Sequence, residues 1–299
     1  MTTIAPPPPP PVVQPPAPPA SPPPLSPGGR TAIRVLLIAA AALLVLGTLG
    51  GLGAAAWGLS TFRVITDSKP LPAAMRSLVV DTGELPVAVR ITADRSATAP
   101  RADMRMINST RAGSHPLVVT DEAGATRVAI SGEPSPYLQW GRAGEITIVL
   151  PPDLARGLSV TARQENGLLM AQADIDQLTA HTVNGPVMLT GSARRVEVHS
   201  TDGDVISRGA VSVTESFAAD TVNGDISVDF TTAPRTVDAT TRDGDVRVGL
   251  PDRGPYLVTA ATDGGDTVIR VPQTSERARA AAVVTVRSDG GDIVIDDVR

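Results

Sequence analysis

One short sequence motif recurs through the second half of the chain and limits its folds more than any other feature. In its clearest copy, residues 221–225, it reads Thr-Val-Asn-Gly-Asp, and a strand-like alternating pattern follows. Asn-Gly and Asp-Gly supply the positive φ angles that tight turns need. Aligned on the residue that ends the turn, the copies stand at Leu168, Pro186, Asp204, Asp225, Asp245, Asp266 and Asp292.

The spacing and the flanking residues of these copies predict a stack of β coils. Successive copies are 18, 18, 21, 20, 21 and 26 residues apart, and a period of this size is typical of stacked repeats. Apolar residues alternate on both sides of each turn, with Ser or Thr four residues before most anchors. Separate hairpins would not explain such matched columns, whereas in a stack each coil buries the apolar face of its neighbour.

The residues upstream of the copies carry weaker strand signals. Residues 78–85 resemble a degenerate copy of the motif, and residues 87–91 alternate as a strand does. Residues 92–116 are irregular. A hairpin is predicted between residues 117–120 and 127–130, and residues 145–150 form a further strand pattern that ends at a proline.

The start of the chain has a different composition. Half of the 28 prolines lie in the first 30 residues. We predict that residues 1–32 are a disordered Pro-rich tail that samples polyproline II. The alternative is a docking site for a proline-reading partner.

A long uncharged segment follows the tail. Residues 35–62 contain no charged residue. A segment of this length is long enough to cross a bilayer, which takes roughly 20 residues. We therefore predict a transmembrane helix over residues 33–60, a linker over 61–76 and a β-strand-repeat domain over 77–299. A cleaved signal peptide is the main alternative. Basic residues flank both ends, and we predict a cytoplasmic N-terminus because long C-terminal domains cross regardless of charge.

The predicted fold class is therefore all-β, a β-solenoid-like stack of ~20-residue repeats preceded by one transmembrane α-helix and a Pro-rich tail. The repeated Thr-x-[Asn/Asp]-Gly-Asp-[Ile/Val] motif resembles the DUF4097 family of β-strand-repeat proteins, which are described as proposed adhesins. The resemblance covers residues 77–299 and is strongest over residues 178–295. It implies a β-solenoid-like domain, and it implies no catalytic residues.

The aspartates that end the turns are the sharpest candidates for a binding site. In a stack they repeat every ~5 Å along one edge, where like charges repel. A Ca²⁺ ion would relieve this repulsion, since it prefers several oxygen ligands. The alternative is that these side chains cap their own turns and stay solvated. The candidate calcium ligands are Asp204, Asp225, Asp245, Asp266 and Asp292.

Two histidines are a second candidate. His181 and His199 each stand five residues before a turn anchor, so we expect them to stack on the outer face. Together with Asp174, Asp176 and Glu197 they could bind a metal. The Ser and Thr column is predicted to be structural, at the corner of each coil.

The composition and the motifs exclude several functions. The chain has no cysteine, which rules out disulfides and thiol catalysis. The net charge of −5 argues against nucleic-acid binding. No nucleophile elbow, P-loop, Rossmann fingerprint or His-Glu-x-x-His motif occurs. We therefore predict no enzymatic activity, no cofactor and no catalytic residue.

The predicted function is that of a single-pass membrane-anchored β-repeat protein of the cell envelope. It would serve as a structural or adhesin-like interaction module, with its β domain outside the cytoplasm. Its partners would be the membrane, an envelope polymer or protein, and other copies of itself. The alternatives are a signalling or regulatory protein whose Pro-rich tail meets a cytosolic partner, and an enzyme acting on an envelope glycan.

Overall fold

The computed structural model describes residues 27–59, 62–109, 117–122, 124–131 and 144–298. The chain divides into two compact units, residues 1–59 and 60–299. The described part of the first unit is helix α1 (Pro27–Leu59). The predicted Pro-rich tail lies almost entirely outside the described residues, although helix α1 already begins at Pro27. Among the described residues, no helix is both long and apolar enough to cross a membrane.

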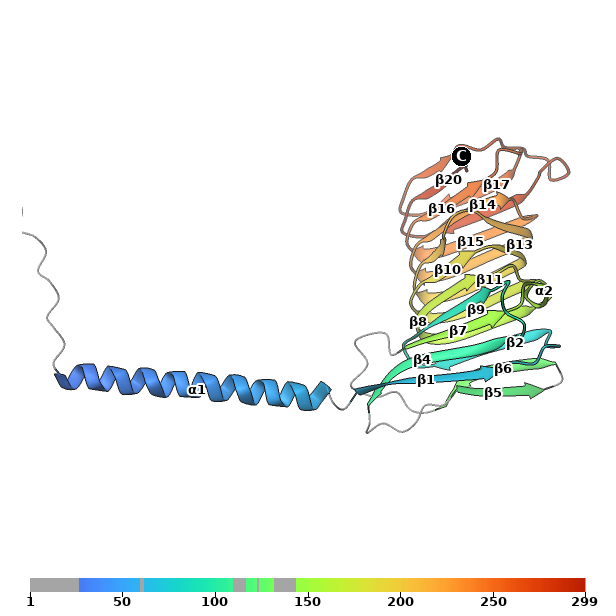
Figure 1. Cartoon of the computed structure of the whole chain (residues 1–299). Coiled ribbons are helices and arrows are strands. Elements are labelled where there is room, and N and C mark those ends of the chain that lie inside the picture. Colours follow the sequence, from blue (N-terminus) through green and yellow to red (C-terminus); the bar gives the residue numbers. More distant parts are fainter. Residues whose placement is uncertain (1–26, 60–61, 110–116, 123, 132–143, 299) are drawn as a thin grey trace, which may run out of the picture. The chain divides into compact units, whose positions relative to one another are not determined.

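The second unit is a stack of coils that follow one another (Figure 1). The strands of these coils form two ladders along the stack. Most strands pair in parallel with the equivalent strands of the neighbouring coils. In spatial order, the first ladder is β1 (Phe62–Pro70), β4 (Arg101–Ser109), β7 (Gly144–Leu150), β3 (Val87–Ala93), β8 (Ser159–Gln172), β10 (Val187–Thr190), β12 (Val205–Ser207), β14 (Ile226–Thr232), β16 (Val246–Leu250), β20 (Ile293–Asp297) and β18 (Thr267–Ile269).

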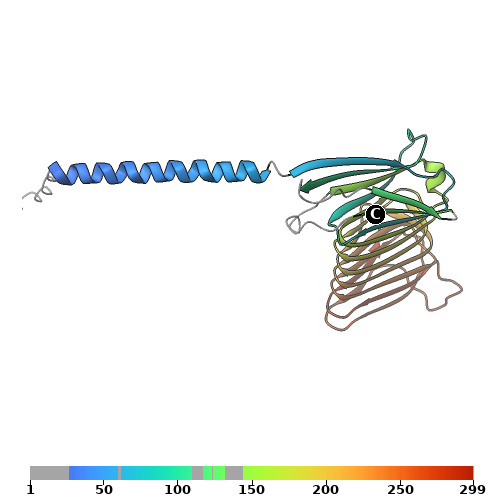
Figure 2. The same cartoon turned by 90° about the horizontal axis from the view of Figure 1, so that it is seen from below.

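The second ladder runs along the other side of each coil, and the long strand β8 belongs to both. A single helical turn, α2 (Pro152–Ala155), precedes β8. In spatial order, the second ladder is β5 (Leu117–Glu122), β6 (Ala125–Ile130), β2 (Ser77–Gly83), β8, β9 (Gln177–Asn184), β11 (Ser192–Asp202), β13 (Val211–Asn223), β15 (Thr236–Asp243), β19 (Val283–Ser288) and β17 (Leu257–Thr262). Figure 2 shows these coils end on, one behind another.

The hydrophobic core lies between the two ladders. Alternate residues of each strand point inward, as in β2, where burial alternates along all seven residues. The motif's apolar columns fill this space: Val198 and Ala239 come from the second ladder, and Ile226 and Val248 from the first. The chain has few aromatic residues, so Val, Ile, Leu and Ala side chains make up most of this thin core. The predicted all-β stack of coils is confirmed.

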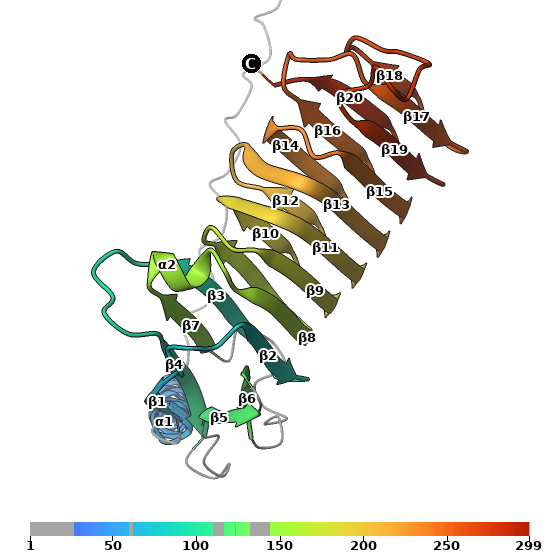
Figure 3. The same cartoon turned by 90° about the vertical axis from the view of Figure 1, so that its right-hand side faces the viewer.

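The order of the last two coils differs from the order of the sequence. Strand β19 pairs with β15 on one side and with β17 on the other, and β20 lies in the same way between β16 and β18. The C-terminal coil is therefore inserted into the stack, and the preceding coil, β17 with β18, stands at the end (Figure 3). The inserted coil buries Val284, Val286 and Ile295 completely, whereas its neighbour offers the smaller Ala260 at the corresponding place.

The first strands also differ from prediction. Strand β1 occupies most of the residues predicted as a linker, and β4 lies within residues 92–116, which were predicted to be irregular. The two strands pair in antiparallel fashion along their full lengths. Proline is tolerated at Pro70 because β1, among the described strands, pairs on one side only, with β4. The predicted hairpin of residues 117–130 is confirmed as β5 and β6.

Candidate functional site

The structure brings all five candidate calcium ligands together in one column, which we call the Asp ladder. Four of the five carboxylates, those of Asp204, Asp225, Asp245 and Asp292, each accept a hydrogen bond from the backbone N–H of the aspartate in the next coil. The donor–acceptor distances are 3.0 Å from Asp225 N to Asp204 Oδ1, and 2.8 Å from Asp245 N to Asp225 Oδ1, from Asp292 N to Asp245 Oδ1 and from Asp266 N to Asp292 Oδ1.

This geometry corrects the expectation that each aspartate caps its own turn. The acceptor serves a donor one coil away, so the side chains join successive coils. In four of the five carboxylates, one oxygen already accepts such a hydrogen bond. Among the described residues, no group of three or more histidine or acidic side chains is placed to hold a metal ion. Calcium binding by the Asp ladder stays a prediction.

The glycine before each turn anchor from Pro186 onward is required by the close approach of neighbouring coils. Gly224 has a φ of 157°, and a Cβ on it would lie 2.4 Å from the carbonyl oxygen of Gly203. At Gly185 the corresponding distance, to the carbonyl oxygen of Gly167, would be 1.7 Å. No side chain fits at such distances, so the glycines form a second column beside the Asp ladder.

The hydroxyl column has the structural role predicted for it. The Thr241 hydroxyl donates to the carbonyl of Gly224 at 2.9 Å, and that of Ser288 donates to Gly244 at 2.9 Å. Each bond again runs to the neighbouring coil. In the first coils the pattern breaks down, because the buried side chains of Thr82, Gln164, Thr182 and Ser200 have no hydrogen-bond partner among the described residues.

His181 and His199 stack as the sequence predicts. Their strands pair in register, and the ring centroids are 5.3 Å apart with 10° between the ring planes. His199 Nε2 lies 3.0 Å from Glu197 Oε1. Partial burial lowers the pKa of His181, and the neighbouring His199 and Arg163 lower it further.

A shallow hollow of about 440 Å³ lies beside His181. Its walls carry both signs of charge, and Asp81 in its lining is paired with Arg127 across 2.5 Å. The amide of Gln164 is enclosed in the protein, so a molecule in the hollow would not reach it. The lining residues are Asp81, Gly83, Arg163, Gln164, Glu165, His181, Thr182 and Val183.

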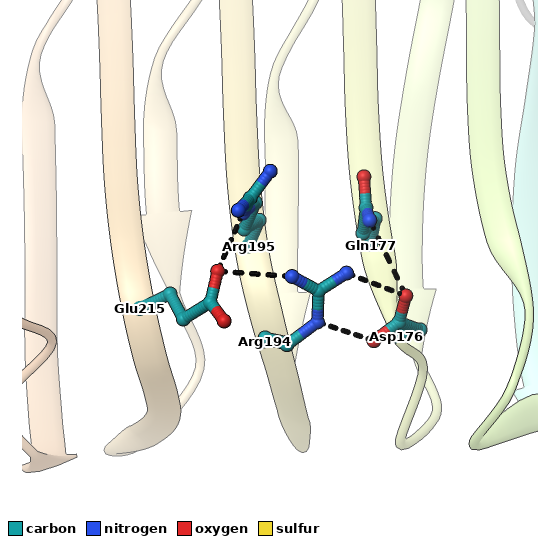
Figure 4. A network of polar contacts seen from close by, with 5 residues as sticks. All are labelled: Asp176, Gln177, Arg194, Arg195 and Glu215. Carbon is teal, nitrogen blue, oxygen red and sulfur yellow. Dashed lines mark hydrogen bonds and ion pairs between the residues drawn. The ribbon is translucent and has the colours of Figure 1, made fainter.

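A polar network centred on Arg194 links three successive coils (Figure 4). Its guanidinium binds both oxygens of Asp176, with Nε at 2.8 Å and Nη2 at 2.9 Å, and reaches Glu215 Oε2 with Nη1 at 2.9 Å. Arg195 donates to the same Glu215 oxygen at 2.6 Å, and Gln177 donates to Asp176 at 3.3 Å.

These contacts make the network an ionic clamp across the coils. The guanidinium groups hold the pKa values of Asp176 and Glu215 below their usual range. Sequence reasoning missed the clamp. The signal was present, because Arg194 follows Asp176 by 18 residues and precedes Glu215 by 21, which are coil separations.

The fold defines a parallel β-repeat protein whose coils are joined by columns of side chains. Residues 155–296 match the family model described as Toastrack DUF4097, which confirms the resemblance predicted from the repeated motif. A search of curated proteins gave no significant match.

Several solved structures are similar to the chain. A "putative adhesin" from Parabacteroides distasonis is 10% identical with a TM-score of 0.44, and one from Bacteroides fragilis is 13% identical with a TM-score of 0.42; each alignment covers 79% of this chain and 97% of the other. A "putative lipid binding protein" from Parabacteroides distasonis is 12% identical with a TM-score of 0.37, covering 78% and 97%.

Proposed function

We propose that this protein is a non-enzymatic interaction module of the cell envelope, anchored by a single membrane span. Its N-terminus would be cytoplasmic and its β-repeat unit would lie outside the membrane. The unit would bind an extended envelope polymer or a protein partner along its coils.

The observation that carries this proposal is the register of the outward-facing side chains. On the outer side of the second ladder, equivalent residues of successive coils stand directly beside one another, separated by about one strand spacing of 4.8 Å. A surface that repeats at a fixed interval suits a partner that is itself extended, as in other stacked-repeat proteins. One such column consists of Arg163, His181, His199, Asp220, Thr240 and Arg287.

Support for the anchor comes from the sequence of the first unit. Residues 35–62 carry no charge. The described apolar side chains of helix α1 between Val35 and Leu49 are 55–72% exposed, which is unusual for large apolar side chains in water. Apolar surroundings, such as a membrane interior, would remove the free-energy cost of exposing these side chains to water.

The absence of cysteine allows a direct test of location and orientation. Single variants Asp220→Cys, on the outer side of β13, and Ala17→Cys, in the Pro-rich tail, each provide one thiol. We expect a membrane-impermeant maleimide to label Asp220→Cys in intact cells, and to label Ala17→Cys only after lysis. The cysteine-free parent chain is the control for background. The reverse labelling pattern, or recovery of the chain in the soluble fraction, would contradict the proposal.

A further inference from the structure

The stack ends in a coil whose strands pair on one side. Strand β17 pairs with β19, and β18 with β20, and the described residues provide no further strand beyond them. This terminal coil covers the core incompletely. Val258, Ala260 and Ile269 are only partly buried, whereas the corresponding Val286 and Ile295 of the adjacent coil are fully buried.

Along this edge, the backbone of β17 presents hydrogen-bonding groups that no described strand pairs with. The N–H groups of Leu257 and Asp263 donate inward, to Ala282 at 3.0 Å and to Ser288 at 3.2 Å. Because successive residues of a strand direct their backbone groups to opposite sides, the N–H and C=O groups of residues 258, 260 and 262 face away from the stack.

The start of this edge already holds a parallel segment of the same chain. Tyr256 forms an isolated parallel bridge with Gln273. Its N–H donates to Pro272 O at 2.8 Å, and its C=O accepts from Thr274 N at 2.9 Å. The edge is therefore shaped for a parallel strand, and the chain's own segment occupies only its first position.

The Asp ladder and the hydroxyl column also end at this coil, and at the end of each column stands a hydrogen-bond acceptor. Within the stack, the donor for each ladder carboxylate comes from the coil that follows it in space, and Asp266 is the last member. In the last coils, the hydroxyls of Thr221, Thr241, Ser288 and Thr262 likewise each donate to a glycine carbonyl of the adjacent coil, and Gly265 ends that glycine column. An added coil would supply a backbone N–H to Asp266 and a hydroxyl to the carbonyl of Gly265.

We propose that the open edge of β17 and β18 is a docking site for an extended polypeptide segment of a partner protein, which adds to the stack as a further parallel coil. The segment would carry Ser or Thr three residues before a glycine. The glycine is needed because a Cβ facing a neighbouring glycine carbonyl finds no room. The residue after the glycine cannot be proline, since its N–H must reach Asp266.

A second copy of this chain does not fit the site as well as a separate segment. Two copies related by a twofold axis would bring their β17 strands together antiparallel, which leaves the Asp and hydroxyl columns without donors. At the other end of the described stack, β1 pairs with β4 and β5 pairs with β6. Both pairs are antiparallel, and β1 and β5 lack the motif. The inference rests on the proposed interaction role, but it does not depend on the membrane anchor.

The chain itself provides the probe for a test. A synthetic peptide of residues 283–298 carries the motif in the form that already binds on the other side of β17. We expect it to bind the full-length protein saturably, and to slow hydrogen exchange at the amides of residues 258, 260 and 262. A peptide with Gly291→Val should not bind.

Two matched variants of the full-length protein locate the binding. Asp266→Ala removes the last ladder carboxylate without removing any bond within the stack, and it should weaken peptide binding by about tenfold. Asp263→Ala removes an equal charge from the same exposed turn and should leave binding unchanged. Ala260→Pro removes an outward N–H and should abolish binding, with the melting temperature measured to confirm folding.

Three results would overturn the docking site. They are no binding of the peptide, binding that Asp266→Ala and Ala260→Pro leave unchanged, and self-association of the protein that protects these amides without peptide. None of them would alter the thiol-labelling result that tests location, so failure of the docking site and failure of the proposed function can be told apart.

Discussion

The backbone N–H of Asp245 donates to the carboxylate of Asp225 in the neighbouring coil, at 2.8 Å. Bonds of this kind join the backbone of one aspartate to the carboxylate of the next, although the two carboxylates repel one another at one strand spacing. The same residue thus ends the turn of its own coil and fixes the position of the next one.

Replacing this carboxylate separates hydrogen bonding from charge. Asp225→Ala leaves the N–H of Asp245 without its acceptor and should lower the free energy of unfolding by about 1 kcal/mol. Asp225→Asn keeps an acceptor and removes a negative charge, so it should cost nothing or stabilise. Urea denaturation of both variants measures the difference. Equal losses for Ala and Asn would show that charge, and not the hydrogen bond, matters at this position.

The glycine column makes a second prediction. Gly224→Ala places a Cβ 2.4 Å from the carbonyl oxygen of Gly203 and should cost at least about 3 kcal/mol. Gly209 also has a positive φ, 79°, but nothing lies within 4 Å of its Cβ position. Gly209→Ala should therefore cost only about 1 kcal/mol of backbone strain. Thermal and chemical denaturation provide the comparison, and similar costs would argue against close coil approach as the reason for the glycine.

The hydroxyl column provides a matched pair of variants. Thr241→Val removes the bond to the Gly224 carbonyl and should cost about 1 kcal/mol. Thr182→Val replaces a buried hydroxyl that has no partner among the described residues, so it should be neutral or slightly stabilising. The difference between the two melting temperatures is the measurement. A larger loss for Thr182→Val would show that its hydroxyl is bonded.

The repeated motif was sufficient to predict the stack, because apolar columns that match from copy to copy are buried when coils stack and are left exposed in separate hairpins. It was not sufficient to predict the order of the last two coils. The segments around Val258 and Val284 carry the same motif and could both follow β15. Which of the two coils lies next to β15 depends on how much apolar volume each coil buries there, and this is a property of the packed stack.

Other parts of the structure depend on contacts that the sequence does not mark. Strand β1 lies in residues 61–76, which were predicted to be a linker, and its pairing with the distant β4 decides its conformation. The Arg194 clamp is made by residues from three coils, and it becomes visible only after the coil separations are used to align residues outside the motif.

The inserted position of the C-terminal coil can be tested by two valine substitutions. Val284 is fully buried between two coils, so Val284→Ala should cost about 2 kcal/mol. Val258 lies in the terminal coil and is partly exposed, so Val258→Ala should cost less than about 1 kcal/mol. If the coils instead followed the order of the sequence, Val258→Ala would be the more damaging change in denaturant unfolding.

The stacked histidines predict a dependence of stability on pH. The pKa of His181 is lowered from 6.5 by burial, by His199 and by Arg163, while Glu197 opposes this shift. Since the folded state then binds fewer protons than the unfolded state, stability is full above pH 6.5 and falls as the pH drops through the folded pKa.

His181→Gln should remove most of this loss, and Arg163→Gln should reduce it by removing one of its causes. Denaturant unfolding of the parent chain and both variants at a neutral and an acidic pH is the measurement. An unchanged loss of stability in His181→Gln would show that other groups are responsible for the pH dependence.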